Sequence, residues 1–279
     1  MKKIIALFSL VCATGLVAAQ ELPKLSQPSK SEHVVGVTKI SLQYSRPSVR
    51  GRVIFGDVVP YDEVWRLGAN EPTKLTSTHD LNIAGQVLPA GSYAVFALPA
   101  ANGNWKIVFN SDFEQWGAGN YDKAKDVVTA EVRVGEGPFT ETLLIDINKV
   151  TTNGASLVIG WEKVWIEVPF TVETDKYAQA NIDAAIAEGK DLDKVYMAAS
   201  NYYFTSKEDL DKAISYIDQS IAVKKTFSNL FVKARILHKK GDTKGAIKLA
   251  EEAKALAEAE KNDRWVGYIQ ENLDEWNKK

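Results

Sequence analysis

The sequence predicts an α+β protein of two parts, an N-terminal antiparallel β-sandwich followed by C-terminal all-α helical hairpins. Up to about residue 172, apolar and polar residues alternate. After Glu173, apolar residues recur every three to four positions instead. Alternation is typical of strands with one buried face, whereas the longer period is typical of amphipathic helices. We therefore divide the chain into a signal peptide (1–19), a linker (20–31), a β-sandwich domain (32–172) and an α-helical domain (173–279).

The N-terminus has the pattern of a secretory signal peptide. Two lysines precede a mostly apolar run, residues 4–17, which is too short to span a bilayer. Small residues then stand where a signal peptidase reads them, so we expect cleavage before Gln20 and export to the periplasm or the exterior. A lipoprotein signal is disfavoured, because Val11 occupies the position before Cys12 where a small residue is needed.

Composition narrows the classes of protein to which the mature chain can belong. Cleavage would remove the only cysteine, so no disulfide or thiol chemistry is expected. It would also remove two lysines, which lowers Lys plus Arg from 34 to 32 against 36 Asp plus Glu and gives a net charge of about −4. This charge does not indicate binding to nucleic acid. No second apolar run reaches transmembrane length, and we expect no cofactor.

The linker and the strands are expected from local patterns. Residues 20–31 carry two prolines and three serines, which favours a tether without a core of its own. Alternating runs predict strands at 128–134, 143–147, 155–161 and 164–170. Turn signals separate the strands at Ala84-Gly85, Pro89-Ala90-Gly91, Asn102-Gly103, Gly135-Glu136-Gly137-Pro138 and Asn153-Gly154. Short strands at this spacing favour a sandwich over a partly closed barrel.

Six helices are expected after the change of period. They are residues 175–188, 192–204, 207–222, 228–240, 243–260 and 264–276. Ser206 with Asp209 resembles a capping box, and Gly189 and Gly241 suit helix C-termini. Ala213 and Ala246 lie 33 positions apart, close to the tetratricopeptide period. A plain antiparallel helical bundle is the alternative.

An ordered series of motifs runs through the predicted sandwich. They are Tyr44-Ser45-Arg46-Pro47-Ser48, Gly51-Arg52, Ile54-Phe55-Gly56, Val59-Pro60-Tyr61, Val64-Trp65-Arg66, Gly68-Ala69-Asn70, Leu88-Pro89-Ala90-Gly91, Tyr93, Trp105, Asn110, Trp116-Gly117 and Tyr121. In this order they resemble a bacterial family of unknown function, DUF2911, over about residues 38–170. The helices that follow resemble the family's pairing of such a domain with tetratricopeptide-like helices. The resemblance implies secretion and a β fold, and it implies no activity.

One short segment supplies the strongest candidate for a ligand site. It places Trp65, Arg66 and Asn70 within six residues, so a guanidinium stands beside an aromatic ring and an amide. We predict that Arg66 points with Asn70 toward a concavity that also receives Arg46 or Arg52, since arginines converge around an anion or carbonyl groups. The alternative interpretation is structural, with a part-buried arginine bonding loop carbonyls and Trp65 in the core.

Trp116 is a second candidate, because a tryptophan in a loop can stack on a sugar ring. Its structural alternative is a lid over one end of the sandwich. The three histidines lie far apart without the spacing of metal ligands, and no nucleophile elbow is present, so neither a metal site nor a catalytic residue is predicted. Glycosidase carboxylates need no local motif, which leaves Asp57, Asp62 and Glu63 as candidates beside their reading as solvated loop charges.

These patterns favour an exported, non-enzymatic binding or scaffolding protein. Its sandwich would bind a glycan, a peptide or a small anionic ligand, and its helices would dock a protein partner. A hydrolase of envelope or dietary glycans, with carboxylates that the sequence does not identify, is the alternative. A purely structural envelope component is the third hypothesis.

Overall fold

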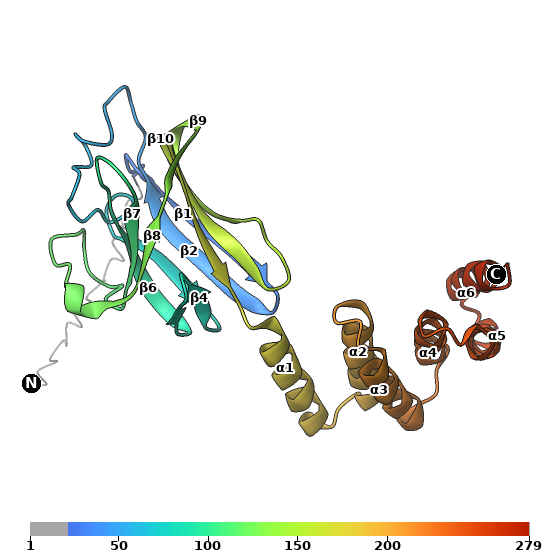
Figure 1. The fold of residues 1–279 in the computed structure, drawn as a ribbon. Coiled ribbons are helices and arrows are strands. Elements are labelled where there is room, and N and C mark those ends of the chain that lie inside the picture. The colour runs from blue at the N-terminus through green and yellow to red at the C-terminus, as the bar shows by residue number, and fades with distance from the viewer. Residues whose placement is uncertain (1–21, 279) are drawn as a thin grey trace, which may run out of the picture. The chain divides into compact units, whose positions relative to one another are not determined.

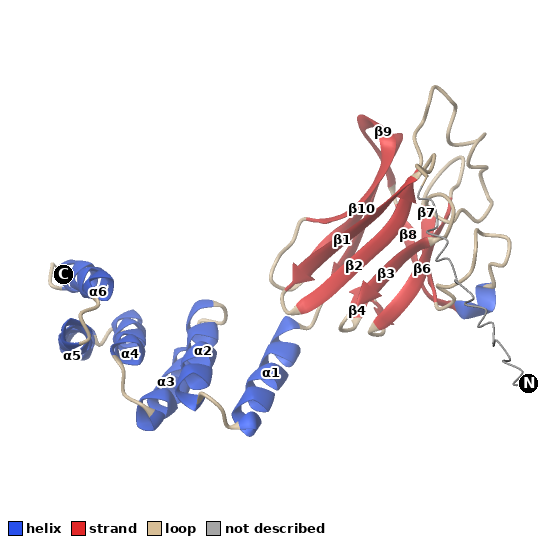
Figure 2. Cartoon of the chain, turned by 180° about the vertical axis from the view of Figure 1, so that it is seen from behind, coloured by secondary structure: helices blue, strands red, loops and turns tan. Residues whose placement is uncertain are grey.

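The structure is a computed structural model of the chain, and it describes residues 22–278. The predicted signal peptide and its cleavage site before Gln20 lie outside the described residues. The chain divides into two compact units between Val172 and Glu173. The first unit contains the ten described strands and the second the six described helices (Figures 1 and 2), so the predicted α+β fold is confirmed.

The first unit is a sandwich of two antiparallel sheets around one core. The larger sheet contains, in spatial order, β1 (Gln27–Val35), β2 (Thr38–Arg46), β3 (Thr73–Ser77), β6 (Gly91–Leu98), β7 (Trp105–Asn110) and β8 (Asp126–Val132). The smaller sheet contains β5 (Gln86–Leu88), β4 (Leu81–Ile83), β10 (Gly154–Thr171) and β9 (Val134–Asn148). Buried side chains from both sheets, such as Leu42 on β2 and Ile145 on β9, pack into this core.

The linker predicted over residues 20–31 is wrong in its second half, because β1 begins at Gln27. This strand pairs with β2 along its whole length, from Gln27 opposite Arg46 to Val35 opposite Thr38. As the edge strand of the sheet it is largely solvated, so its residues lack the apolar alternation that reveals inner strands. An edge position also tolerates Pro28, which has no N–H to donate to a neighbour.

The turn predicted at residues 135–138 is also wrong, since these residues belong to β9. Gly135 pairs with Trp165 of β10. A Cβ on Gly137 would stand 2.2 Å from Cδ1 of Trp165, so glycine is needed here to admit the indole rather than to make a turn. The other predicted turns lie between strands, and Ala84 (φ 51°) with Gly85 (φ 75°) joins β4 to β5 in a tight hairpin.

The two alternating runs predicted at 155–161 and 164–170 form one strand, β10. Its core-facing positions change from odd numbers, up to Trp161, to even numbers, from Ile166, where Glu162 has φ 55° and the pairing with β9 shifts on both sides of it. At each shift β10 advances by two residues and β9 by four, and such an irregularity re-aims the side chains that follow. It leaves Trp161, 2% exposed, in the core.

A long connection, residues 47–72, runs from β2 to β3 without a strand or helix of its own. Buried side chains fix it to the core, among them Ile54, Val59 and Leu67. An isolated bridge pairs Trp65 with Ala97 of β6, with hydrogen bonds of 2.8 Å in both directions. Ordered connections of this length in compact domains are usually functional.

The second unit consists of helices that pack mainly on their sequence neighbours. They are α1 (Thr174–Glu188), α2 (Leu192–Thr205), α3 (Leu210–Val223), α4 (Phe227–Lys239), α5 (Thr243–Ala259) and α6 (Asp263–Trp276). Ala213 on α3 and Ala246 on α5 are fully buried in the second helix of their hairpins, α2–α3 and α4–α5. None of the helices described here has both the length and the apolar character to cross a membrane.

The capping box predicted at Ser206 is wrong. Asp209 is itself the N-cap of α3, and its side chain accepts a hydrogen bond from the Lys212 N–H. A true capping box instead begins α4, where Thr226 and Asn229 bond each other's backbone N–H groups.

Candidate functional site

A cavity of about 240 Å³ lies between the long connection and β10. Arg50, Arg52 and Arg66 line it together with the indoles of Trp65 and Trp161. No aspartate or glutamate is among the residues that line this cavity. Within residues 22–278, no arginine has a carboxylate oxygen within 4.0 Å of its guanidinium. We call this space the arginine cavity.

Two stacked indoles form the apolar wall of the arginine cavity. The rings of Trp65 and Trp161 lie 5.7 Å apart with an angle of 19° between their planes, and Phe55 packs edge-on against both. Trp65 is only 8% exposed, and its Nε1 donates to the Gly68 carbonyl over 3.3 Å. Trp65 is therefore a core residue that also faces the cavity. The structural interpretation and the ligand-site interpretation of this residue are compatible.

The backbone around Arg66 is held in a defined and strained conformation. Leu67 and Asn70 have left-handed φ angles of 50° and 61°, which cost free energy for residues with a Cβ. The Thr73 N–H donates to the Arg66 carbonyl over 3.1 Å, and the Thr73 hydroxyl donates to the Leu67 carbonyl. A Cβ on Gly68 would stand 3.0 Å from the Ser45 carbonyl oxygen, so the loop lies tightly against β2. These contacts fix the position of Arg66 before any ligand arrives.

Two N–H donors at the arginine cavity have no partner among the described residues. They are Arg66 Nε and Trp161 Nε1, and both atoms are inaccessible to solvent. Buried donors in proteins are nearly always hydrogen-bonded, and an unpaired one costs about 1–3 kcal/mol. Both atoms are closed off from the cavity by the residues around them, so the donors available to a ligand are the other guanidinium N–H groups.

Arg50 and Arg52 donate some of their N–H groups to backbone carbonyls of the protein. Arg52 donates from Nε to the Val49 carbonyl over 3.0 Å and from Nη2 to the Ser48 carbonyl over 2.7 Å. Arg50 donates from Nη2 to the Leu25 carbonyl over 2.8 Å. Each guanidinium has five N–H donors, so both keep donors for a ligand while these bonds fix their orientation.

The comparison with protein families can now be set beside this geometry. A family model described as "Protein of unknown function (DUF2911)" matches residues 26–170, more than half of the chain. The chain belongs to the DUF2911 family. Searches of curated proteins and of solved structures give no match. The matched residues include the whole of the long connection and most of β10, so every residue that lines the arginine cavity except Leu25 lies in the DUF2911 region.

The DUF2911 region brings together three of the six residues singled out in the sequence: Arg52, Trp65 and Arg66. Arg46 does not line the arginine cavity. Its Nε donates to the Leu143 carbonyl over 3.3 Å, and it borders a neighbouring depression together with Arg50.

Asn70 and Trp116 also lie apart from the arginine cavity. The Asn70 amide points to β2, where Nδ2 donates to Ser45 Oγ over 3.1 Å, so it positions the loop instead of facing the cavity. Trp116 is 64% exposed in the loop between β7 and β8. The concavity predicted for Arg66 therefore receives Arg52, but neither Asn70 nor Arg46.

Sequence reasoning missed Trp161 as a member of this site. Its alternation with Ile159 marked it as a core residue, but no local signal placed it beside Trp65, almost a hundred residues earlier. The candidate carboxylates Asp57, Asp62 and Glu63 are exposed and do not line the arginine cavity. Across residues 22–278, no group of three or more histidine, cysteine, aspartate or glutamate side chains is arranged to hold a metal ion.

Proposed function

We propose that this DUF2911 protein is an exported, non-enzymatic binding protein whose arginine cavity holds a small carboxylate ligand. The observation that carries the proposal is the convergence of three arginines that have no carboxylate partner and keep N–H donors free. A carboxylate would supply the missing negative charge and accept hydrogen bonds from these donors. The planar guanidinium forms paired hydrogen bonds to such a group.

The size and walls of the arginine cavity restrict the ligand further. A volume of about 240 Å³ lies below the usual range of drug-sized sites, about 300–1,000 Å³. The stacked indoles of Trp65 and Trp161 offer an apolar surface beside the guanidinium groups. A compact acid with a ring or short carbon body, such as a single sugar acid, combines both properties.

The hydrolase alternative finds less support at this position. Glycoside hydrolysis uses two carboxyl groups about 5–10 Å apart across the scissile bond. The residues that line the arginine cavity include no carboxyl group. Three fixed positive charges favour retention of an anion over acid catalysis.

Titration calorimetry on the full chain at low salt tests the binding proposal, with glucuronate, succinate and inorganic phosphate as probes. We expect a carboxylate to bind with Kd below about 1 mM and to bind more weakly as salt is raised. Arg66→Ala should weaken binding about 10-fold or more, and Arg66→Lys should restore it only in part, because lysine lacks the planar fork. Arg133→Ala, at an exposed arginine outside the arginine cavity, is the matched control. Equal losses in Arg66→Ala and Arg133→Ala would contradict the proposal.

Export and a docking role of the helices complete the proposal. Export is supported by the apolar run of residues 4–17 and the small residues before Gln20. N-terminal sequencing of the mature protein should start at Gln20, and a lipid-modified Cys12 would contradict this.

The tandem hairpins of residues 173–279 are typical of proteins that present extended binding surfaces. Chemical cross-linking in cells should place partner cross-links on this unit, and cross-links confined to residues 22–172 would argue against docking.

A further inference from the structure

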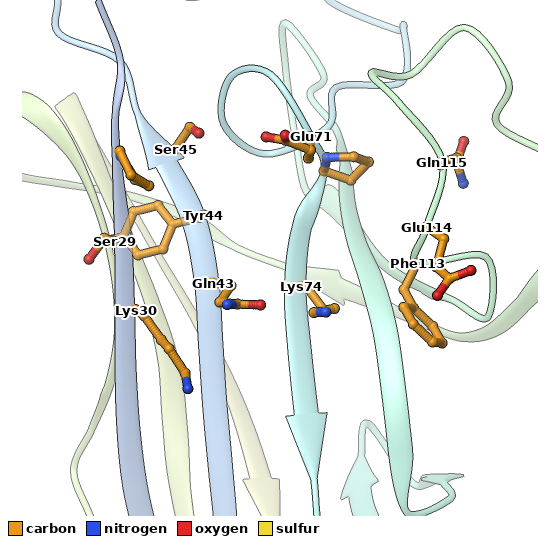
Figure 3. A pocket seen from close by; sticks show the side chains of 12 residues that line it. Ser29, Lys30, Gln43, Tyr44, Ser45, Glu71, Lys74, Phe113, Glu114 and Gln115 are labelled. Carbon is orange, nitrogen blue, oxygen red and sulfur yellow. The ribbon is translucent and has the colours of Figure 1, made fainter. Parts of the chain in front are cut away.

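A second cavity, of about 530 Å³, lies on the outer face of the larger sheet (Figure 3). Its floor is formed by β1, β2 and β3, and one side is formed by the loop that carries Phe113 and Glu114. It shares no lining residue with the arginine cavity. We call it the sheet cavity.

A row of three polar side chains crosses the floor of the sheet cavity. Strand register places Lys30 of β1 opposite Gln43 of β2, and Gln43 opposite Lys74 of β3. Figure 3 shows these side chains next to one another on neighbouring strands. Strands lie about 4.8 Å apart, so the row offers amino, amide and amino groups over roughly 10 Å. This spacing suits a ligand with several polar groups along its length.

The charges around the sheet cavity balance. Lys30 and Lys74 contribute two positive charges, and Glu71 and Glu114 contribute two negative charges. In the described chain these four groups form no ion pair with one another, and Lys30 instead pairs with Glu32 over 3.0 Å. Donors and acceptors are therefore present in similar numbers and are not consumed by one another. The lining therefore has no net charge and gives no net attraction to a strongly anionic or cationic ligand.

Gln115 adds an acceptor that lacks a partner. Its side chain is only 9% exposed, and its Nε2 donates to the Asp112 carbonyl over 2.9 Å. Its Oε1 is buried and has no hydrogen-bond partner among residues 22–278. Because this oxygen is closed to solvent, Gln115 shapes the wall of the sheet cavity, and its Oε1 offers no contact to a ligand. The neighbouring Phe113 is half-buried, packs against the cluster of Ala94, Phe96 and Val108, and has Lys74 Nζ 5.5 Å from its ring centroid, so it holds Lys74 at the edge of the sheet cavity.

We propose that the sheet cavity binds a neutral oligosaccharide. Hydroxyl groups both donate and accept, which matches the mixed lysine, glutamine and glutamate lining, and they carry no charge, which matches its electrostatic balance. The volume falls within the range of established ligand sites. Glu71 and Glu114 are exposed, whereas a glycosidase acid needs burial to raise its pKa, so the arrangement favours binding over cleavage.

The test is a titration of the full chain with neutral gluco-, manno- and xylo-oligosaccharides, in which calorimetry and NMR measure binding. We expect at least one series to bind with Kd below about 1 mM. This affinity should change little between about 0.01 M and 0.15 M salt, because the ligand is uncharged. Lys74→Ala and Gln43→Ala should each weaken binding about 10-fold, through lost hydrogen bonds. Lys39→Ala, at an exposed lysine on β2 outside the sheet cavity, should leave binding unchanged.

Three outcomes would overturn the assignment. The first is the absence of binding by every neutral series. The second is binding that survives both Lys74→Ala and Gln43→Ala. The third is binding that is lost in Arg66→Ala or falls steeply with salt, which would place the ligand in the arginine cavity. Stronger binding of a zwitterionic peptide, with the same dependence on Lys74, would show that the sheet cavity recognises peptides and would also refute the oligosaccharide.

Discussion

The side-chain amide of Asn70 donates a hydrogen bond to the Ser45 hydroxyl over 3.1 Å, and this bond fastens the loop that separates the two cavities to β2. On one side of Asn70, Arg66 and Ala69 line the arginine cavity. On the other side, Glu71 lines the sheet cavity, so one residue positions both walls.

Substitution of Asn70 should therefore affect both binding sites. Asn70→Ala removes the bond to Ser45 and leaves a Cβ residue at φ 61°, so we expect unfolding to become easier by about 1–2 kcal/mol. Asn70→Gly loses the same bond but accepts the left-handed backbone, so it should be less destabilising. Chemical denaturation measures both effects. Equal stability of Asn70→Ala and wild type would show that the bond to Ser45 does not hold the loop.

Substitutions of Arg66 and of Arg52 should differ in their effect on the stability of the folded protein. Arg66 Nε is a buried donor without a partner in the described chain, so Arg66→Ala removes the cost of that donor and should not lower the free energy of unfolding without ligand. Arg52 bonds two carbonyls of its own turn, so Arg52→Ala should destabilise by about 1 kcal/mol. Thermal melts of both variants beside wild type make the comparison. A loss of about 1–3 kcal/mol in Arg66→Ala, with no lost ligand, would identify Arg66 as scaffold.

The sandwich should fold without the helices. Its buried apolar cluster runs from Val35 to Val172 and contains no residue of α1–α6. We expect a fragment of residues 22–172 to be soluble, to show a β-type circular dichroism spectrum and to unfold cooperatively. A fragment of residues 173–279 serves as the helical counterpart. If residues 22–172 are soluble only when the helices are attached, the two units share a core and the boundary near Glu173 is wrong.

The junction of α1 with α2 should weaken in acid. Asp175 accepts a hydrogen bond from the Tyr202 hydroxyl over 2.6 Å and pairs with Lys207. The hydrogen bond from Lys207 and then the one from Tyr202 lower the pKa of Asp175 below its ordinary value of 3.8. Because the folded-state pKa is the lower one, the stabilisation is complete above pH 3.8 and is lost as pH falls through the lowered value.

The measurement compares wild type with Asp175→Asn by denaturation across pH. The difference in unfolding free energy should be greatest near neutral pH, should stay below about 1 kcal/mol because Asp175 is half exposed, and should shrink below pH 3.8. Asp183→Asn, on the same helix but without a lysine partner, is the control. A difference that grows as the pH falls would contradict the sign of this linkage.

The period of the apolar residues and the turn signals were sufficient to predict the β-sandwich and the helical unit. The inner strands and the helices depend on which residues avoid water, and this preference repeats along the sequence with period 2 or 3.6. For α1, α2 and α4–α6 the observed bounds lie within one residue of those predicted. The edge strand β1 escaped detection because solvent covers most of it. The start of α3 was misplaced because both Ser206 and Asp209 are capable caps.

Tertiary structure alone decided which of the predicted residues meet. The sequence by itself marked Arg52, Trp65 and Arg66 as candidates for binding, because guanidinium groups and an aromatic ring lie close together in the chain. It did not determine that Trp161 stacks on Trp65, because that contact depends on the irregular pairing of β10 with β9 around Glu162 and on the arrangement of distant strands. The row of Lys30, Gln43 and Lys74 has the same origin, since strand register, which couples residues far apart in sequence, places them side by side.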